Sequence, residues 1–97
     1  MLLTVNKSAF ETRNLENCLK YATEDTPVLL YEDAVWAAAS GTSIEPMMRE
    51  ALKKYQIFAL QEDLKTRGLK NVIDGIKVVD YAGFVELAEK HVVCSWT

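Results

Sequence analysis

A chain of 97 residues has room for one domain with a modest core, because folding at this size buries only about two-thirds of the unfolded surface. Its 49% hydrophobic and 26% charged residues are typical of a globular protein and exclude a disordered, collagen-like or disulfide-dense chain. The net charge is −3 and the Lys and Arg residues form no basic run, which argues against direct nucleic-acid binding. We therefore expect one domain over residues 1–97.

Targeting and metal-binding patterns are missing from the sequence. The first residues lack the charged segment, apolar run and cleavage site of a signal peptide. The apolar run at residues 34–39 is far shorter than the roughly 20 residues that cross a bilayer. Cys18 and Cys94 form no CxxC pair, and the single His91 has no neighbouring ligand pair. We expect a cytoplasmic protein with reduced thiols and with no membrane contact, metal or cofactor.

Short apolar runs predict four strands, at residues 2–5, 28–31, 57–60 and 76–79. The runs are continuous rather than alternating, which is typical of parallel strands that are covered on both faces. The stretches between them are long enough for crossover helices, so the pattern predicts a three-layer α/β/α fold with a mostly parallel sheet. A fifth strand at 92–96 is expected to close one side. The central strands are expected to contain Leu29, Leu30, Phe58, Ala59, Val78 and Val79.

Helices are predicted at residues 11–23, 34–39, 47–54, 61–67 and 81–91, with Gly68 ending the fourth. The second of them is apolar almost all the way round, whereas an outer helix of a small domain normally has a polar face. Another chain is therefore expected to cover it. The surface that carries Val35 and Trp36 is the predicted interface.

Acidic residues follow three of the predicted strands, at the sheet edge where open α/β proteins usually bind ligands. Two interpretations are open for this set, which comprises Glu32, Asp33, Glu62, Asp63 and Asp80. Either the acids line a binding mouth, or the aspartates cap the helices that follow, and capping is the preferred interpretation. Carboxylates there would repel phosphates, and neither a GxGxxG nor a P-loop motif is present, so no nucleotide cofactor is expected.

Cys18 falls at the margin of the apolar stripe of the first predicted helix. A thiol that accepts sulfur is favoured by a helix N-terminus or a nearby cation, and the sequence offers Cys18 neither. A packing role is therefore preferred for Cys18, with reactivity left open, and Cys94 is interpreted as structural. His91 is interpreted as a residue that interacts with a helix C-terminus, and one histidine does not support a hydrolase.

An ordered set of segments over nearly the whole chain carries a family resemblance. The segments are LTVNKSAF at 3–10, NLENCLK at 14–20, VLLYEDAVWAA at 28–38, DLKTRG at 63–68 and VDYAGFV at 79–85. Together with Trp96 near the end, this set resembles the TusB/DsrH family. The chain is closer to DsrH-type members, because Cys18 matches a cysteine that is found in them.

The resemblance implies a subunit of a cytoplasmic sulfur-relay (persulfide sulfurtransferase) complex with a five-stranded parallel sheet. The implied partners are two paralogous subunits, TusC/TusD-like or DsrF/DsrE-like, in a heterohexamer, with a TusE/DsrC-like sulfur carrier downstream. The implied pathway is 2-thiolation of the tRNA wobble uridine or dissimilatory sulfur oxidation. The principal sulfur-bearing cysteine of such complexes belongs to another subunit. Cys18 is then either a transient persulfide carrier or a packing residue of a catalytically silent scaffold, and an independent small-molecule enzyme ranks last.

Overall fold

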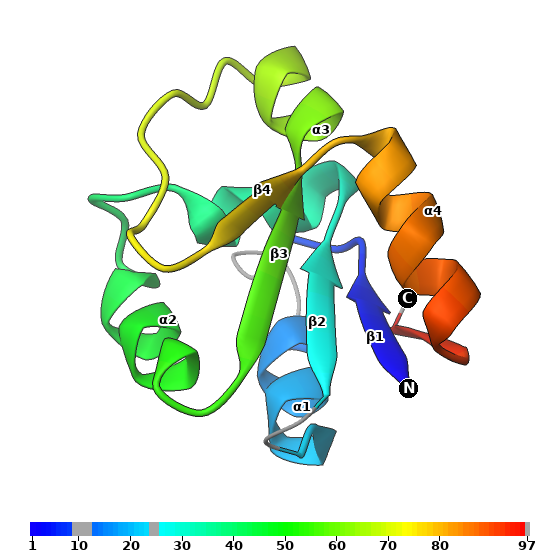
Figure 1. The fold of residues 1–97 in the computed structure, drawn as a ribbon. Coiled ribbons are helices and arrows are strands. Elements are labelled where there is room, and N and C mark those ends of the chain that lie inside the picture. Colours follow the sequence, from blue (N-terminus) through cyan, green and yellow to red (C-terminus); the bar gives the residue numbers. More distant parts are fainter. Residues whose placement is uncertain (9–12, 24–25, 97) are drawn as a thin grey trace.

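The computed structural model describes residues 1–8, 13–23 and 26–96, in which strands and helices alternate along the chain (Figure 1). In these ranges the strands are β1 (Leu2–Val5), β2 (Pro27–Leu30), β3 (Gln56–Leu60), β4 (Lys77–Val79) and β5 (Val93–Trp96). They form one sheet in the order β4-β3-β2-β1-β5, and every neighbouring pair is parallel. The predicted parallel α/β architecture is confirmed.

The helical elements are α1 (Asn14–Tyr21), η1 (Glu32–Ala38), α2 (Glu45–Leu52), α3 (Gln61–Thr66) and α4 (Tyr81–Lys90). Part of the first predicted helix, residues 11–12, lies outside the described residues. η1 is a 3-10 helix rather than an α-helix. Gly68 has a φ of +67° after the end of α3, which confirms its predicted role because glycine adopts this conformation without a Cβ clash. None of the described helices is long and apolar enough to span a bilayer.

One face of the sheet is covered by several helical elements, and we call it the thick face. Alternate strand residues contribute to its core, because successive side chains of a strand point to opposite faces. The sheet residues in this core are Leu3, Val5, Val28, Leu30, Ile57 and Ala59. α1, η1, α2 and α3 pack buried side chains against them, among them Leu15, Val35, Met48 and Leu64.

The opposite face, which we call the thin face, is covered by α4 alone among the described helices. Its buried cluster consists of Leu2, Leu29 and Phe58, against which Phe84 and Leu87 of α4 pack. No residue of α4 is fully buried. Three layers are therefore present, but the two outer layers are unequal.

The position of β4 differs from the prediction. β4 pairs with β3 on one side and lies at the end of the strand order, so it is an edge strand. The prediction that Val78 and Val79 lie in a central strand is wrong, and Val78 is 47% exposed. β2 and β3 are interior strands, and their predicted residues Leu29, Leu30, Phe58 and Ala59 are buried as expected.

Candidate functional site

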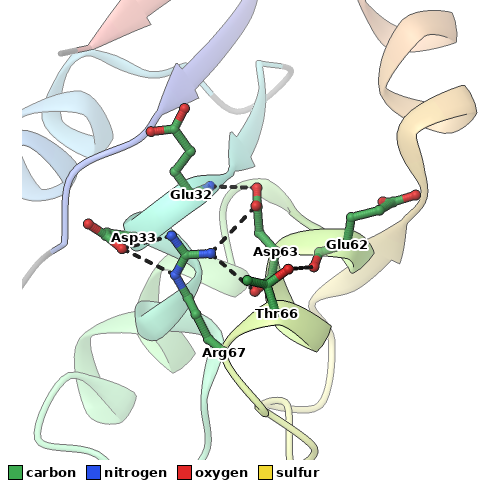
Figure 2. Close-up of polar contacts among 6 residues, drawn as sticks. All are labelled: Glu32, Asp33, Glu62, Asp63, Thr66 and Arg67. Carbon is green, nitrogen blue, oxygen red and sulfur yellow. Dashed lines mark hydrogen bonds and ion pairs between the residues drawn. The ribbon is translucent and has the colours of Figure 1, made fainter.

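The carboxyl ends of the strands bring a group of acidic side chains to one edge of the sheet, as the sequence predicted. η1 follows β2 and carries Glu32 and Asp33, α3 follows β3 and carries Glu62 and Asp63, and Asp80 follows β4. We call these five residues the acidic edge. Open α/β sheets usually bind ligands in this position, and Figure 2 shows the central polar contacts.

Arg67, which the sequence did not mark, joins two of these acids. Its Nη2 lies 2.8 Å and its Nε 3.1 Å from Oδ1 of Asp33, and its Nη1 lies 3.5 Å from Oδ1 of Asp63 (Figure 2). The Arg67 side chain is only 21% exposed, so the guanidinium is partly removed from water, where an ion pair is screened less than on open surface. Arg67 thereby ties η1 to α3 and offsets part of the negative charge.

The backbone of Glu32 is held in an uncommon conformation. Its φ is +49°, in the left-handed region that residues other than glycine adopt rarely and at a cost of about 1 to 3 kcal/mol. The N–H of Glu32 donates a hydrogen bond of 2.7 Å to Oδ2 of Asp63. The same carboxylate that Arg67 contacts therefore also fixes the turn from β2 into η1. The side chain of Glu32 points away from Arg67 (Figure 2).

The N-terminus of α4 is occupied by two carboxylates of the chain itself. Asp80 is the N-cap, and its Oδ1 accepts a hydrogen bond of 2.8 Å from the N–H of Gly83, which confirms its predicted capping role. Oε2 of Glu62 accepts a hydrogen bond of 3.2 Å from the N–H of Tyr81. α3 packs on the thick face and α4 on the thin face, so their connections diverge between β3 and β4. The hydrogen bond from Tyr81 to Glu62 therefore joins α4 to α3 across the end of β3 and β4.

The capping prediction is wrong for Asp33 and Asp63. The N-cap positions of η1 and α3 fall on Tyr31 and Leu60, because each helix begins directly after its strand. Asp33 and Asp63 consequently lie inside the first turn. Their carboxylates accept hydrogen bonds from Arg67 instead.

The acidic edge offers little to a ligand that carries negative charge. In the described part of the chain, no group of three or more His, Cys, Asp or Glu side chains is arranged to hold a metal ion.

Tyr31 lies directly before the acidic edge in the sequence. Burial, and to a lesser extent the nearby Glu32 carboxylate, raises the pKa of the Tyr31 phenol, although a hydrogen bond with Thr4 acts in the opposite direction. The phenol of Tyr31 is therefore a neutral group at physiological pH.

Cys18 lies in α1 and is fully buried in the core of the thick face. Burial and, to a lesser extent, the nearby Cys94 raise the pKa of its thiol from 9.0 to about 12. At neutral pH the thiolate would then be on the order of one part in 100,000. Since the thiolate is the species that accepts sulfur, the structure favours the packing role for Cys18, and its role as a persulfide carrier stays a prediction.

The other two residues that the sequence singled out lie near the end of the chain. Cys94 is on β5, where it is half-buried and packs against the thick-face core. His91 is the C-cap of α4, at the helix terminus where the sequence predicted it. Neither residue belongs to the acidic edge.

The predicted interface on η1 has to be corrected. Val35 is fully buried in the thick-face core, so the chain itself covers most of this apolar helix. Trp36 is 39% exposed and stays on the surface. The interface prediction therefore rests on Trp36 alone, because Val35 has no surface to offer a partner.

Residues 7–93 match the family model for the DsrH like protein. The chain is 37% identical over 92 residues to Protein TusB of Escherichia coli K12, and the match covers 94% of each chain. It is 36% identical over 92 residues to Protein TusB of Shigella flexneri, with the same coverage. This chain belongs to the DsrH family. The TusB/DsrH resemblance seen in the sequence is confirmed.

Solved structures share the fold of this DsrH-family chain. The ychN protein from E. coli superimposes with a TM-score of 0.80 over 97% of both chains at 20% sequence identity. A protein of unknown function from Methanobacterium thermoautotrophicum gives a TM-score of 0.72 at 13% identity, over 97% of this chain and 96% of its own. At these identities the likeness concerns the fold alone.

Arg67 is the polar residue of this DsrH-family chain that sequence reasoning missed. It comes directly before Gly68 at a helix end, which is an ordinary position for a basic residue. Its partner Asp33 lies 34 residues away in the sequence, so no local pattern connects the two. The only local signal was Asp63, four residues before Arg67 on the helix whose C-cap is Arg67.

Proposed function

We propose that this chain is a catalytically silent subunit of a sulfur-relay complex, in which another subunit supplies the sulfur-bearing thiol. Membership of the DsrH family and the similarity to proteins named TusB support the sulfur-relay part. The absence of a catalytic role is supported above all by Cys18, which is fully buried and whose thiol has a pKa raised to about 12. Such a thiol neither meets a persulfide nor ionises near neutral pH.

The acidic edge supports the same assignment. The sequence resemblance implies that the principal sulfur-bearing cysteine of these complexes lies in a loop after a strand. In this chain the residues after β2, β3 and β4 are acids, and the only cysteines of the sequence lie in α1 and β5. A persulfide anion would be repelled by these carboxylates, which outnumber the one guanidinium beside them.

The proposed partners are two paralogous subunits, TusC/TusD-like or DsrF/DsrE-like, in a cytoplasmic heterohexamer that passes sulfur to a TusE/DsrC-like carrier. The similarity to proteins named TusB favours the branch that thiolates the wobble uridine of tRNA. The cysteine at position 18 is the feature that favours the sulfur-oxidising branch instead. In either branch the contribution of this chain is to shape the assembly.

Persulfide mapping of the assembled complex tests this proposal. The complex of this chain with its two paralogous subunits is loaded from a persulfide donor, and the added sulfur is located by mass spectrometry. We expect sulfur on a partner cysteine and none on Cys18. The variant Cys18→Ala is expected to transfer sulfur to the carrier within roughly twofold of the wild-type rate, because a buried thiol contributes no reacting group.

Two other results would contradict different parts of this proposal. Sulfur on Cys18, or loss of transfer by Cys18→Ala in a complex that stays assembled, would make this chain a sulfur carrier. Full transfer by the two paralogous subunits without this chain would remove the proposed scaffold role as well.

A further inference from the structure

A groove of about 310 Å³ runs between α1 and α2 on the outside of the thick face. Leu19 of α1, Met47 and Ala51 of α2, and Tyr55 after α2 contribute apolar surface to it. These side chains also pack against the thick-face core from the other side. The floor of the groove is therefore formed by side chains that are held in place by packing against the thick-face core.

The rims of the groove carry the same charge pattern twice. Glu16 and Lys20 lie on α1. Glu50 lies on α2 and Lys54 lies two residues after its end, so each rim has a glutamate followed by a lysine four residues later. α1 and α2 run in the same direction, because each leads from the carboxyl end of one parallel strand towards the amino end of the next. Both glutamates thus precede their lysines in one direction, and the groove has an acidic end and a basic end.

These charges remain available to another molecule. Glu16 and Lys20 are 3.8 Å apart and both are well exposed. Glu50 pairs at 3.1 Å with Lys53, which does not line the groove, rather than with Lys54. Exposed pairs of this kind contribute little stability, so a partner gives up little by rearranging them.

We propose that this groove docks an amphipathic helix of a partner chain. The inference rests on the proposed function, because the partner meant is one of the paralogous subunits. The apolar side of the helix fills the groove with residues at i, i+3 or i+4, and i+7. Its basic residues face Glu16 and Glu50, and its acidic residues face Lys20 and Lys54.

The charge pattern also sets the direction of the docked helix. Helices commonly carry acidic residues in the first turn and basic residues in the last turn. The N-terminus of the partner helix then lies at the basic end of the groove, and the helix runs antiparallel to α1 and α2. This orientation places its dipole opposite to theirs, which is electrostatically favourable. A small molecule would have to present opposite charges at both ends of an apolar body to match the same surface.

Two adjacent lysines provide a matched test. Lys54 lines the groove, whereas Lys53 does not, and each is replaced in turn as Lys54→Glu and Lys53→Glu. The measured quantity is the dissociation constant of each variant for the purified pair of paralogous subunits. We expect Lys54→Glu to weaken binding roughly tenfold, because it places a like charge opposite the acids of the docked helix. Lys53→Glu breaks the exposed pair with Glu50 but changes no residue that lines the groove, and its binding is expected to stay within roughly twofold of the wild type.

A composition-neutral variant sharpens the result. This variant exchanges the glutamate and the lysine on both rims, which keeps the net charge and reverses the two ends of the groove. The changes are Glu16→Lys with Lys20→Glu on one rim, and Glu50→Lys with Lys54→Glu on the other. Binding is expected to fall further than with Lys54→Glu alone, while circular dichroism shows an unchanged fold. Since every replaced side chain is exposed at the rim, loss of folding is not expected to account for the effect.

The outcomes separate the two proposals. If the wild-type chain does not bind the paralogous subunits, the proposed function fails and this inference falls with it. If the wild type binds and Lys53→Glu and Lys54→Glu behave alike, or the reversed groove binds as well as the native one, the groove is not the docking site and the proposed function survives. Self-association that only Lys54→Glu abolishes would identify a second copy of this chain as the occupant and overturn the inference.

Discussion

The two faces of the sheet are covered to different depths, although the same strands supply both. On the thick face, four helical elements bury side chains against the sheet, and Leu30 lies in that core. On the thin face, α4 alone covers a small cluster that contains Leu29, the neighbour of Leu30 in β2. This difference indicates that packing on the thick face contributes most of the free energy of unfolding. The helix on the thin face leaves apolar side chains on the surface, such as Val85, which is 38% exposed.

The largest expected effect compares Leu30→Ala with Leu29→Ala, two residues that are equally and fully buried. We expect Leu30→Ala to lower the free energy of unfolding by about 4 kcal/mol and Leu29→Ala by about 2.5 kcal/mol. The cavity under Leu29 is covered by a single helix that has no fully buried residue, so it is expected to collapse more easily. Urea denaturation measures both values. Equal losses, or a larger loss for Leu29→Ala, would show that the thin face carries more stability than its packing indicates.

A smaller effect is expected at the two cysteines. Cys18→Ser puts a hydroxyl into the thick-face core in place of a fully buried thiol, and we expect it to cost about 2 kcal/mol. Cys94→Ser, at a half-buried position, is expected to cost less than about 1 kcal/mol. Thermal denaturation of the two variants side by side gives the comparison. A Cys18→Ser variant as stable as Cys94→Ser would contradict the buried position of Cys18.

The raised pKa of Cys18 predicts a loss of stability in alkali. Below pH 9 the thiol is protonated in both the folded and the unfolded chain, so its full contribution is present. Between pH 9 and about 12 only the unfolded chain releases the proton, and the free energy of unfolding falls by up to about 1.4 kcal/mol per pH unit. Cys18→Ala should remove this part of the pH dependence while other groups titrate as before. Parallel stability curves for the wild type and the variant above pH 9 would refute the shift.

The ion pairs of Arg67 are expected to contribute about 1 kcal/mol, because they join two elements of the thick face and the Arg67 side chain is only 21% exposed. Arg67→Met is compared with Arg49→Met, which removes an i, i+4 pair within one helix, where the Arg49 side chain is 55% exposed, and is expected to cost about 0.3 kcal/mol. Chemical denaturation in low salt measures the difference. A loss at Arg67 no greater than at Arg49 would mean that the acidic edge is held by packing rather than by charge.

Trp36→Lys is also expected to change stability little, by less than about 0.5 kcal/mol, because Trp36 is partly on the surface. Its effect on assembly is expected to be large, since a charge would be placed in the predicted interface. Val85→Lys on the thin face is the matched comparison, because the two side chains are exposed to nearly the same extent. Size-exclusion chromatography with the paralogous subunits reads the outcome. Assembly that survives Trp36→Lys but not Val85→Lys would move the interface to the thin face.

The strands were predictable because each is a continuous apolar run, and such runs are local. The prediction at residues 2–5 coincides with β1, and the other four strands agree within one residue at each end. Helix boundaries were less accurate, since η1 is a 3-10 helix and α2 begins and ends two residues before its predicted bounds of 47 and 54. The acidic edge was also predictable, because parallel strands place their carboxyl ends together.

The sequence by itself determined the parallel sheet, the set of acids at its carboxyl edge and the family of this chain, because runs of hydrophobicity and ordered segments are properties of the chain's own order. Only the tertiary structure decided that β4 is an edge strand, that Val35 is core, that Cys18 is fully buried and that Arg67 contacts Asp33. Each of these depends on which distant segments become neighbours. That depends in turn on the strand order and on which face each helix covers, and no local pattern records either of them.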